Sequence, residues 1–156
     1  MELLQPTPHL PPLEALTQGR ADSWVLPVFA EQKPPRGWLG RVDWECLGWV
    51  SHLLREGHLE GSLGEWTWIP ILRPAPLKPA RILLFGCGPH PDAPDLPDAR
   101  TPSDVFPTQM QKRYLTQRLS LLSPGEKLLW TRDAWNGWQG PSPERLAEGL
   151  IYVRLD

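Results

Sequence analysis

The 156 residues are enough for one compact domain with its own core, and we expect a single domain over residues 1–156. The composition, 40% hydrophobic and 22% charged, is typical of a water-soluble protein. A net charge of −2 gives no electrostatic basis for binding nucleic acid or an anionic membrane, because both rest on basic patches. Two cysteines are too few for a disulfide scaffold, and we interpret Cys46 and Cys87 as small buried apolar residues.

Targeting signals are not apparent in the sequence. Residues 1–12 lack the basic start and apolar run of a secretory signal. No segment approaches the roughly 20 apolar residues of a membrane span. We therefore expect a cytoplasmic protein that does not enter membranes.

The first half of the chain predicts a strand and then a long helix. Residues 23–29 are rich in β-formers, and a Pro/Gly loop follows over 31–37. Residues 42–56 place their apolar side chains on one arc at helical spacing. Gly57 follows at the position where a helix-ending glycine is expected.

Two further strands are predicted in the middle of the chain. Residues 65–71 alternate, with Trp66 and Trp68 on one face, and residues 81–85 form an apolar run typical of a strand buried on both faces. The proline-rich connection between them is too short for a crossover helix, which favours antiparallel pairing and a mixed sheet.

The second half predicts a helix, a strand and a helix. Residues 89–103 are expected to be a loop, and residues 106–122 a helix with Pro107 in its first turn. A strand is predicted over 126–131, and a last helix over 142–151. Alternating strands and helices of this kind predict an α/β fold, built as a three-layer α/β/α sandwich with a mixed central sheet.

Three segments in register resemble the N-terminal domain of the cytosol (leucyl) aminopeptidase family. They are ADSWVLPVF at 21–29, GWVSHLLREGHLEGSLGE at 48–65 and RILLFGCG at 81–88. Further on, AEGLIY at 147–152 resembles the point where that domain hands over to the catalytic domain. The resemblance implies a macro-domain-like fold, standing alone without the catalytic domain.

The resemblance also implies what is missing. The family binds two divalent metals in its catalytic domain through motifs resembling Met-Lys-x-Asp-Met and Asn-Thr-Asp-Ala-Glu-Gly-Arg, and neither occurs here. Two-metal hydrolysis needs several converging carboxylates. We therefore assign no catalytic residue, no metal ligand and no cofactor, and expect a protein that is not itself an enzyme.

The turn Gly86-Cys87-Gly88 is the candidate ligand-binding segment. It follows a strand, where α/β sheets often place ligands, and its backbone N–H groups suit a phosphate. The simpler interpretation is a tight turn that needs positive φ. Cys87 has no identifiable base beside it, which argues against a nucleophile.

Histidines and acidic residues offer weaker metal candidates. His52, Glu56 and His58 lie near one another in sequence, but His52 falls on the polar face of the predicted helix. A second group, His90 with Asp92, Asp95 and Asp98, lies in a proline-rich segment without calcium-loop spacing. We interpret both groups as solvated surface.

Nine tryptophans are the more unusual feature. Core packing is expected to account for most of them, while Trp44 and Trp49 flank the apolar arc of the first predicted helix. Trp135 and Trp138 lie in a loop-like Asn/Gly segment and are the candidates for partial exposure at a protein interface.

Two functions remain open from the sequence. The first is a non-catalytic interaction or regulatory module that associates with itself or with a separate peptidase. The alternative is a macro-like module that binds a nucleotide or ADP-ribose type of small molecule.

Overall fold

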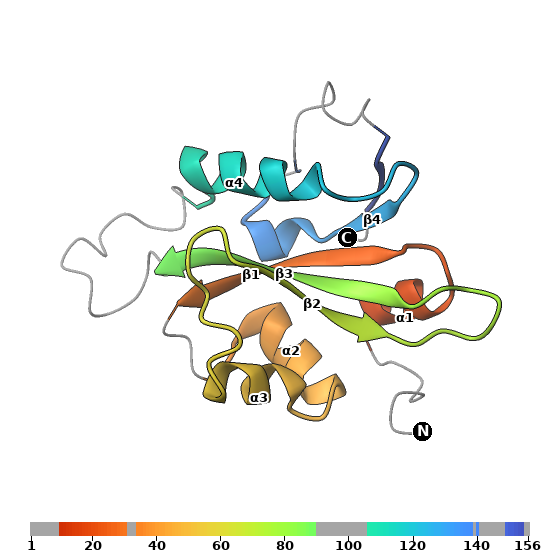
Figure 1. Cartoon of the computed structure of the whole chain (residues 1–156), viewed down its shortest axis with the longest axis horizontal. Coiled ribbons are helices and arrows are strands. Elements are labelled where there is room, and N and C mark those ends of the chain that lie inside the picture. The colour runs from red at the N-terminus through yellow and green to blue at the C-terminus, as the bar shows by residue number, and fades with distance from the viewer. Residues whose placement is uncertain (1–9, 31–33, 90–105, 139, 141–148, 155–156) are drawn as a thin grey trace.

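A computed structural model describes residues 10–30, 34–89, 106–138, 140 and 149–154. These residues form a five-stranded sheet between two layers of helices (Figure 1). In chain order the elements are α1 (Pro11–Thr17), β1 (Ser23–Ala30), α2 (Gly37–Glu45), α3 (Trp49–Arg55), β2 (Trp66–Ile71), β3 (Ala80–Pro89), α4 (Gln109–Leu119), β4 (Lys127–Trp130), the 3₁₀ helix η3 (Arg132–Trp135) and β5 (Ile151–Arg154).

The sheet has the strand order β2-β3-β1-β4-β5 and is mixed, as the sequence predicts. The central strand β1 pairs in parallel with β3 on one side and with β4 on the other, and β4 pairs in parallel with β5. Strand β2 pairs antiparallel with β3, from Trp66 opposite Phe85 to Ile71 opposite Ala80. The short proline-rich connection between these two strands is therefore a hairpin connection, as expected.

Each face of the sheet has its own apolar core. Helices α1, α2 and α3 cover the face that carries Trp24, Leu26 and Val28 of β1. Helix α4 covers the opposite face (Figure 1), and its Leu115 and Leu119 belong to the core on that side. Residues 82–85 of β3 alternate between the two cores and are all buried, which confirms the prediction for this run and the three-layer sandwich.

The long helix expected over residues 42–56 is wrong, because the chain turns a corner there and forms two helices. Leu47 and Gly48 both have left-handed φ angles, of 58° and 82°, which end α2. The carboxylate of Asp43 then accepts hydrogen bonds from Ser51 N at 2.8 Å and Ser51 Oγ at 2.5 Å, so it caps the start of α3. Gly57 ends α3 with a φ of 74°, as expected.

Three further element boundaries differ from the sequence predictions. Helix α1 is not expected, although two prolines at its start and an apolar face are compatible with one. Helix α4 begins only at Gln109, because Thr108 and Gln111 form a capping box, so Pro107 lies before the helix. Ile151 opens strand β5 where the last helix was expected; most of that prediction, and of the loop over 89–103, lies outside the described residues.

Candidate functional site

The segment Gly86-Cys87-Gly88 continues strand β3 and is not the tight turn expected from the sequence. Val28 of β1 lies opposite Gly86, and Phe29 lies opposite Gly88, so Cys87 is the extra residue of a β-bulge. Only Gly88 has a positive φ, of 77°.

The N–H groups of both glycines already have partners. Gly86 N donates to the carbonyl oxygen of Glu65 at 2.8 Å, and Gly88 N donates to that of Gly61 at 2.7 Å. A Cβ on Gly86 would lie 1.9 Å from the carbonyl oxygen of Ser62. The absence of a side chain at Gly86 therefore permits the close approach of residues 61–65. The N–H groups of Gly86 and Gly88 are not free to bind the phosphate that the sequence suggested.

Cys87 is enclosed by the core under α4. Its side chain is 3% exposed, and its carbonyl oxygen accepts a hydrogen bond from Gln111 Nε2 at 2.8 Å. Burial raises the pKa of the Cys87 thiol well above its ordinary value, so the nucleophilic thiolate is suppressed. The prediction of a buried apolar cysteine is confirmed at this position.

Trp135, expected to be partly exposed, is completely buried. Its indole stacks on Trp130 with ring centroids 5.1 Å apart and on Phe106 at 5.9 Å. Its Nε1 donates to the carbonyl oxygen of Val25 at 3.3 Å. Trp138 is partly buried and packs edge-on against Trp130, so this pair belongs mainly to the core, and Trp135 offers no surface to a partner.

Two of the exposed tryptophans lie elsewhere, at the corner between α2 and α3. Trp44 is 83% exposed, Leu47 67% and Trp49 47%. We call these three residues the corner patch. The sequence contains a signal for this exposure, since both tryptophans flank the apolar arc and Gly48 interrupts the helical pattern. The prediction of one continuous helix over residues 42–56 did not use that signal.

A small hollow lies at the carboxyl end of β1, the edge at which open α/β sheets usually bind ligands. Its volume is about 230 Å³, which is below the roughly 300–1,000 Å³ of typical ligand pockets. Its walls come from β1, the start of α2 and η3: Leu26, Pro27, Phe29, Arg36, Gly37, Trp38, Leu39, Asp133 and Ala134.

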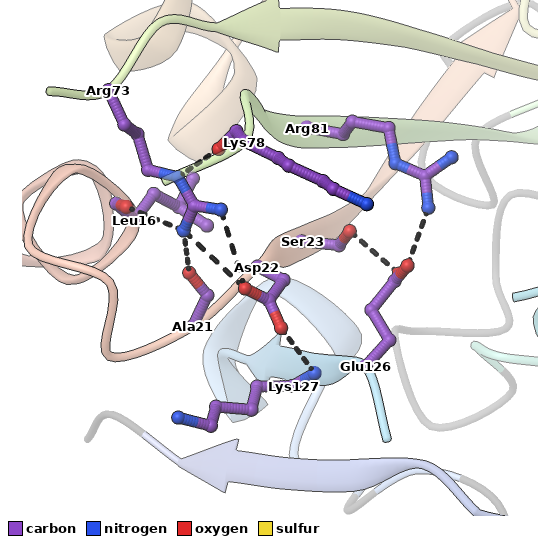
Figure 2. A network of polar contacts seen from close by, with 9 residues as sticks. All are labelled: Leu16, Ala21, Asp22, Ser23, Arg73, Lys78, Arg81, Glu126 and Lys127. Carbon is purple, nitrogen blue, oxygen red and sulfur yellow. Dashed lines mark hydrogen bonds and ion pairs between the residues drawn. The ribbon is translucent and has the colours of Figure 1, made fainter. Parts of the chain in front are cut away.

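A polar network lies at the opposite end of β1, where the strand begins (Figure 2). Arg73, whose side chain is 4% exposed, donates to the carbonyl oxygens of Ala21 and Lys78 and pairs with Asp22 at 3.5 Å. Through these bonds the β2–β3 connection is held against the residues that follow α1. Next to it, Ser23 and Arg81 donate hydrogen bonds to Glu126.

Metal-ligating side chains do not gather in the part of the chain that the structure describes, where no three of the His, Cys, Asp and Glu residues form a group. His52 stacks on Trp49 with ring centroids 5.4 Å apart. The group of His90, Asp92, Asp95 and Asp98 lies outside the described residues.

Comparison with known proteins leaves the family resemblance as an expectation. No protein-family model matches the sequence, and no curated protein is detectably similar to it. Among the described helices, none has the length and apolar character needed to cross a membrane.

Proposed function

We propose that this protein is a non-catalytic interaction module that associates through the corner patch. The main support is that Trp44, Leu47 and Trp49 expose large apolar side chains at one corner of the fold. Tryptophan is among the residues that most often dominate binding energy at protein interfaces. Exposed apolar residues that are close together mark interaction sites more often than scattered ones do.

The backbone of Leu47 supports this proposal. A left-handed φ is uncommon for a residue other than glycine and costs roughly 1–2 kcal/mol in an L-residue. Leu47 bears this strain although its side chain is largely exposed and contributes little to the core. A strained residue that is not needed for packing suggests a role in contact with another molecule.

The charges around the corner patch favour a second copy of this chain as the partner. On the two helices that meet at the corner, Arg41 and Arg55 are exposed, as is Glu56 at the end of α3, while Glu45 is partly exposed. A two-fold axis sets the same surface against itself, so a patch flanked by both signs of charge can place cations opposite anions. A separate peptidase, which the family resemblance suggests, is the other possible partner.

Sedimentation of the purified protein over a range of concentrations tests the proposal. We expect the protein to form a dimer, and the double variant W44S/W49S to raise the dissociation constant at least about tenfold, because two apolar anchors are lost. The matched control is Trp68→Ser, since Trp68 is 50% exposed but lies on β2, away from the corner.

The outcome can contradict the proposal in two ways. Self-association through the patch is wrong if the protein stays monomeric at high concentration, or if W44S/W49S and Trp68→Ser weaken the dimer equally. For a monomer, binding to a purified catalytic domain of a leucyl aminopeptidase family member, lost in W44S/W49S, would instead identify a peptidase as the partner.

The small-molecule alternative draws on the hollow at the carboxyl end of β1. The start of α2 contributes to its wall, and helix starts favour anions. Its volume suits a fragment of a nucleotide better than a whole one. Addition of ADP-ribose should raise the melting temperature if this alternative is correct, and an unchanged melting temperature would contradict it.

A further inference from the structure

A larger groove lies at the end of the sheet where β1 begins, beside the polar network of Figure 2. Its volume is about 640 Å³, within the roughly 300–1,000 Å³ of small-molecule sites. One wall is the β2–β3 connection and the other is the turn between α4 and β4. The lining residues are Asp22, Arg73, Pro76, Leu77, Lys78, Pro79, Arg81, Ser123, Pro124, Gly125 and Glu126.

Both carboxylates in the groove are already bonded. Glu126 accepts hydrogen bonds from Ser23 Oγ at 2.8 Å and from Arg81 at 2.7 Å. Asp22 accepts from Arg73 and from the backbone N–H of Lys127 at 3.0 Å. The side chains of Ser23 and Glu126 are largely buried, so this floor is built into the fold.

The cations of the groove, in contrast, have donors to spare. Within the described ranges, the ammonium group of Lys78 has no hydrogen-bond or ion-pair partner. Arg81 uses one terminal nitrogen for Glu126, while its guanidinium lies 5.9 Å from the ring centroid of Trp68. Figure 2 shows the Lys78 side chain running from the hairpin connection toward the Arg81 side of the network.

The charge balance points the same way. Arg73, Lys78 and Arg81 contribute three positive charges to the lining, against two negative charges from Asp22 and Glu126. Since Arg73 pairs with Asp22 and Arg81 with Glu126, one positive charge remains in the lining, that of Lys78. Prolines and Leu77 supply apolar wall surface beside these donors.

We propose that this groove binds a small organic anion. Its carboxylate or phosphate group accepts hydrogen bonds from Lys78 and Arg81, and its apolar part contacts the walls formed by Leu77 and the prolines. Charge-assisted hydrogen bonds of this kind are the stronger ones in proteins. The groove is open to solvent, which screens the charges and sets the affinity in a modest range.

Titration followed by backbone amide NMR at constant ionic strength tests this site. Benzoate and phenyl phosphate are the probes for the two anionic groups, and neutral benzamide is the matched control. We expect one or both anions to shift the amide signals of Lys78, Arg81 and Gly125 in a saturable way, while benzamide does not.

Substitutions at two lysines complete the test. Lys78→Met keeps the apolar stem and removes the charge, so we expect about tenfold weaker binding, with Lys78→Arg restoring it. Lys127→Met is the control, since its side chain is exposed outside the groove lining.

Several results would overturn the proposal. They are equal shifts with benzamide, shifts that grow linearly without saturation, shifts centred on the hollow at the other edge of β1, or binding unaffected by Lys78→Met. The corner patch plays no part in this experiment, so its outcome is independent of the proposed self-association.

Discussion

Tryptophan side chains lie in opposite environments in two regions of this molecule, the aromatic core under α4 and the corner between α2 and α3. In the aromatic core, Trp130 and Trp135 are completely buried and stacked on one another. At the corner, Trp44 and Trp49 expose much of their surface. The composition alone cannot separate these uses, because the same residue type serves both.

The difference lies in the indole N–H groups and in the backbone that carries them. In the interior, Trp130 Nε1 donates to the carbonyl oxygen of Trp138 at 2.8 Å, and Trp24 Nε1 donates to Thr131 Oγ1 at 3.2 Å. A buried indole needs such a partner, because an unsatisfied buried donor is costly. The corner residues lie where the chain reverses between two short helices, and neither side chain is enclosed.

The largest expected effect is that of Trp135→Ala. Removing a fully buried, stacked indole should lower the free energy of unfolding by about 3–5 kcal/mol, as for other large aromatic deletions in cores. Chemical denaturation monitored by circular dichroism measures this loss. Trp44→Ala is the matched variant at the corner and should change stability by less than about 0.5 kcal/mol. Similar losses in both variants would show that the corner tryptophan contributes as much to stability as the buried one.

Gly86 and Gly48 test the backbone of the core and of the corner in the same way. Gly86→Ala sets a Cβ against the backbone oxygen of Ser62 and should cost roughly 1–3 kcal/mol by overpacking. Gly48→Ala at the corner meets no atom within 4 Å, so only its left-handed φ opposes the change. Denaturation midpoints of the two variants should therefore rank Gly86→Ala as the more damaging, and the reverse order would show that residues 61–65 yield easily.

The smallest expected effect is a pH dependence from Cys46. Burial, with the nearby Asp43 and Glu45 charges, raises the pKa of this thiol to about 11 from 9.0. Between these values the unfolded chain loses the proton and the folded chain keeps it, so stability falls as pH rises from about 9 toward 11. Cys46→Ala should show a shallower fall in melting temperature over this range. An unchanged slope would contradict the assignment to Cys46.

Much of the fold follows from the sequence because its signals are local. The run at residues 82–85 and the alternation in β2 reflect burial directly, and the short hairpin connection dictates antiparallel pairing. The break at Leu47 does not follow, because it depends on a left-handed leucine that no propensity favours. The burial of Trp135 depends on stacking with Phe106 and Trp130, which are distant in sequence or separated by a turn.

The candidate sites were less predictable than the elements. Gly86 and Gly88 resemble a ligand-binding turn in sequence, yet their role depends on residues 61–65 lying against them. The groove lined by Lys78 and Arg81 combines the hairpin with the turn before β4, and no local motif connects these segments. Long-range packing of this kind carries no periodic signal along the chain.

The two thiols of this chain can report on two different opening motions of the fold, because they differ in burial. Cys87, on β3, is buried in the core under α4, so an alkylating reagent reaches it only after α4 separates from the sheet. Cys46, at the partly buried corner, is reached after a smaller local movement. The ratio of their alkylation rates would therefore report how far the corner loosens before the sandwich itself comes apart.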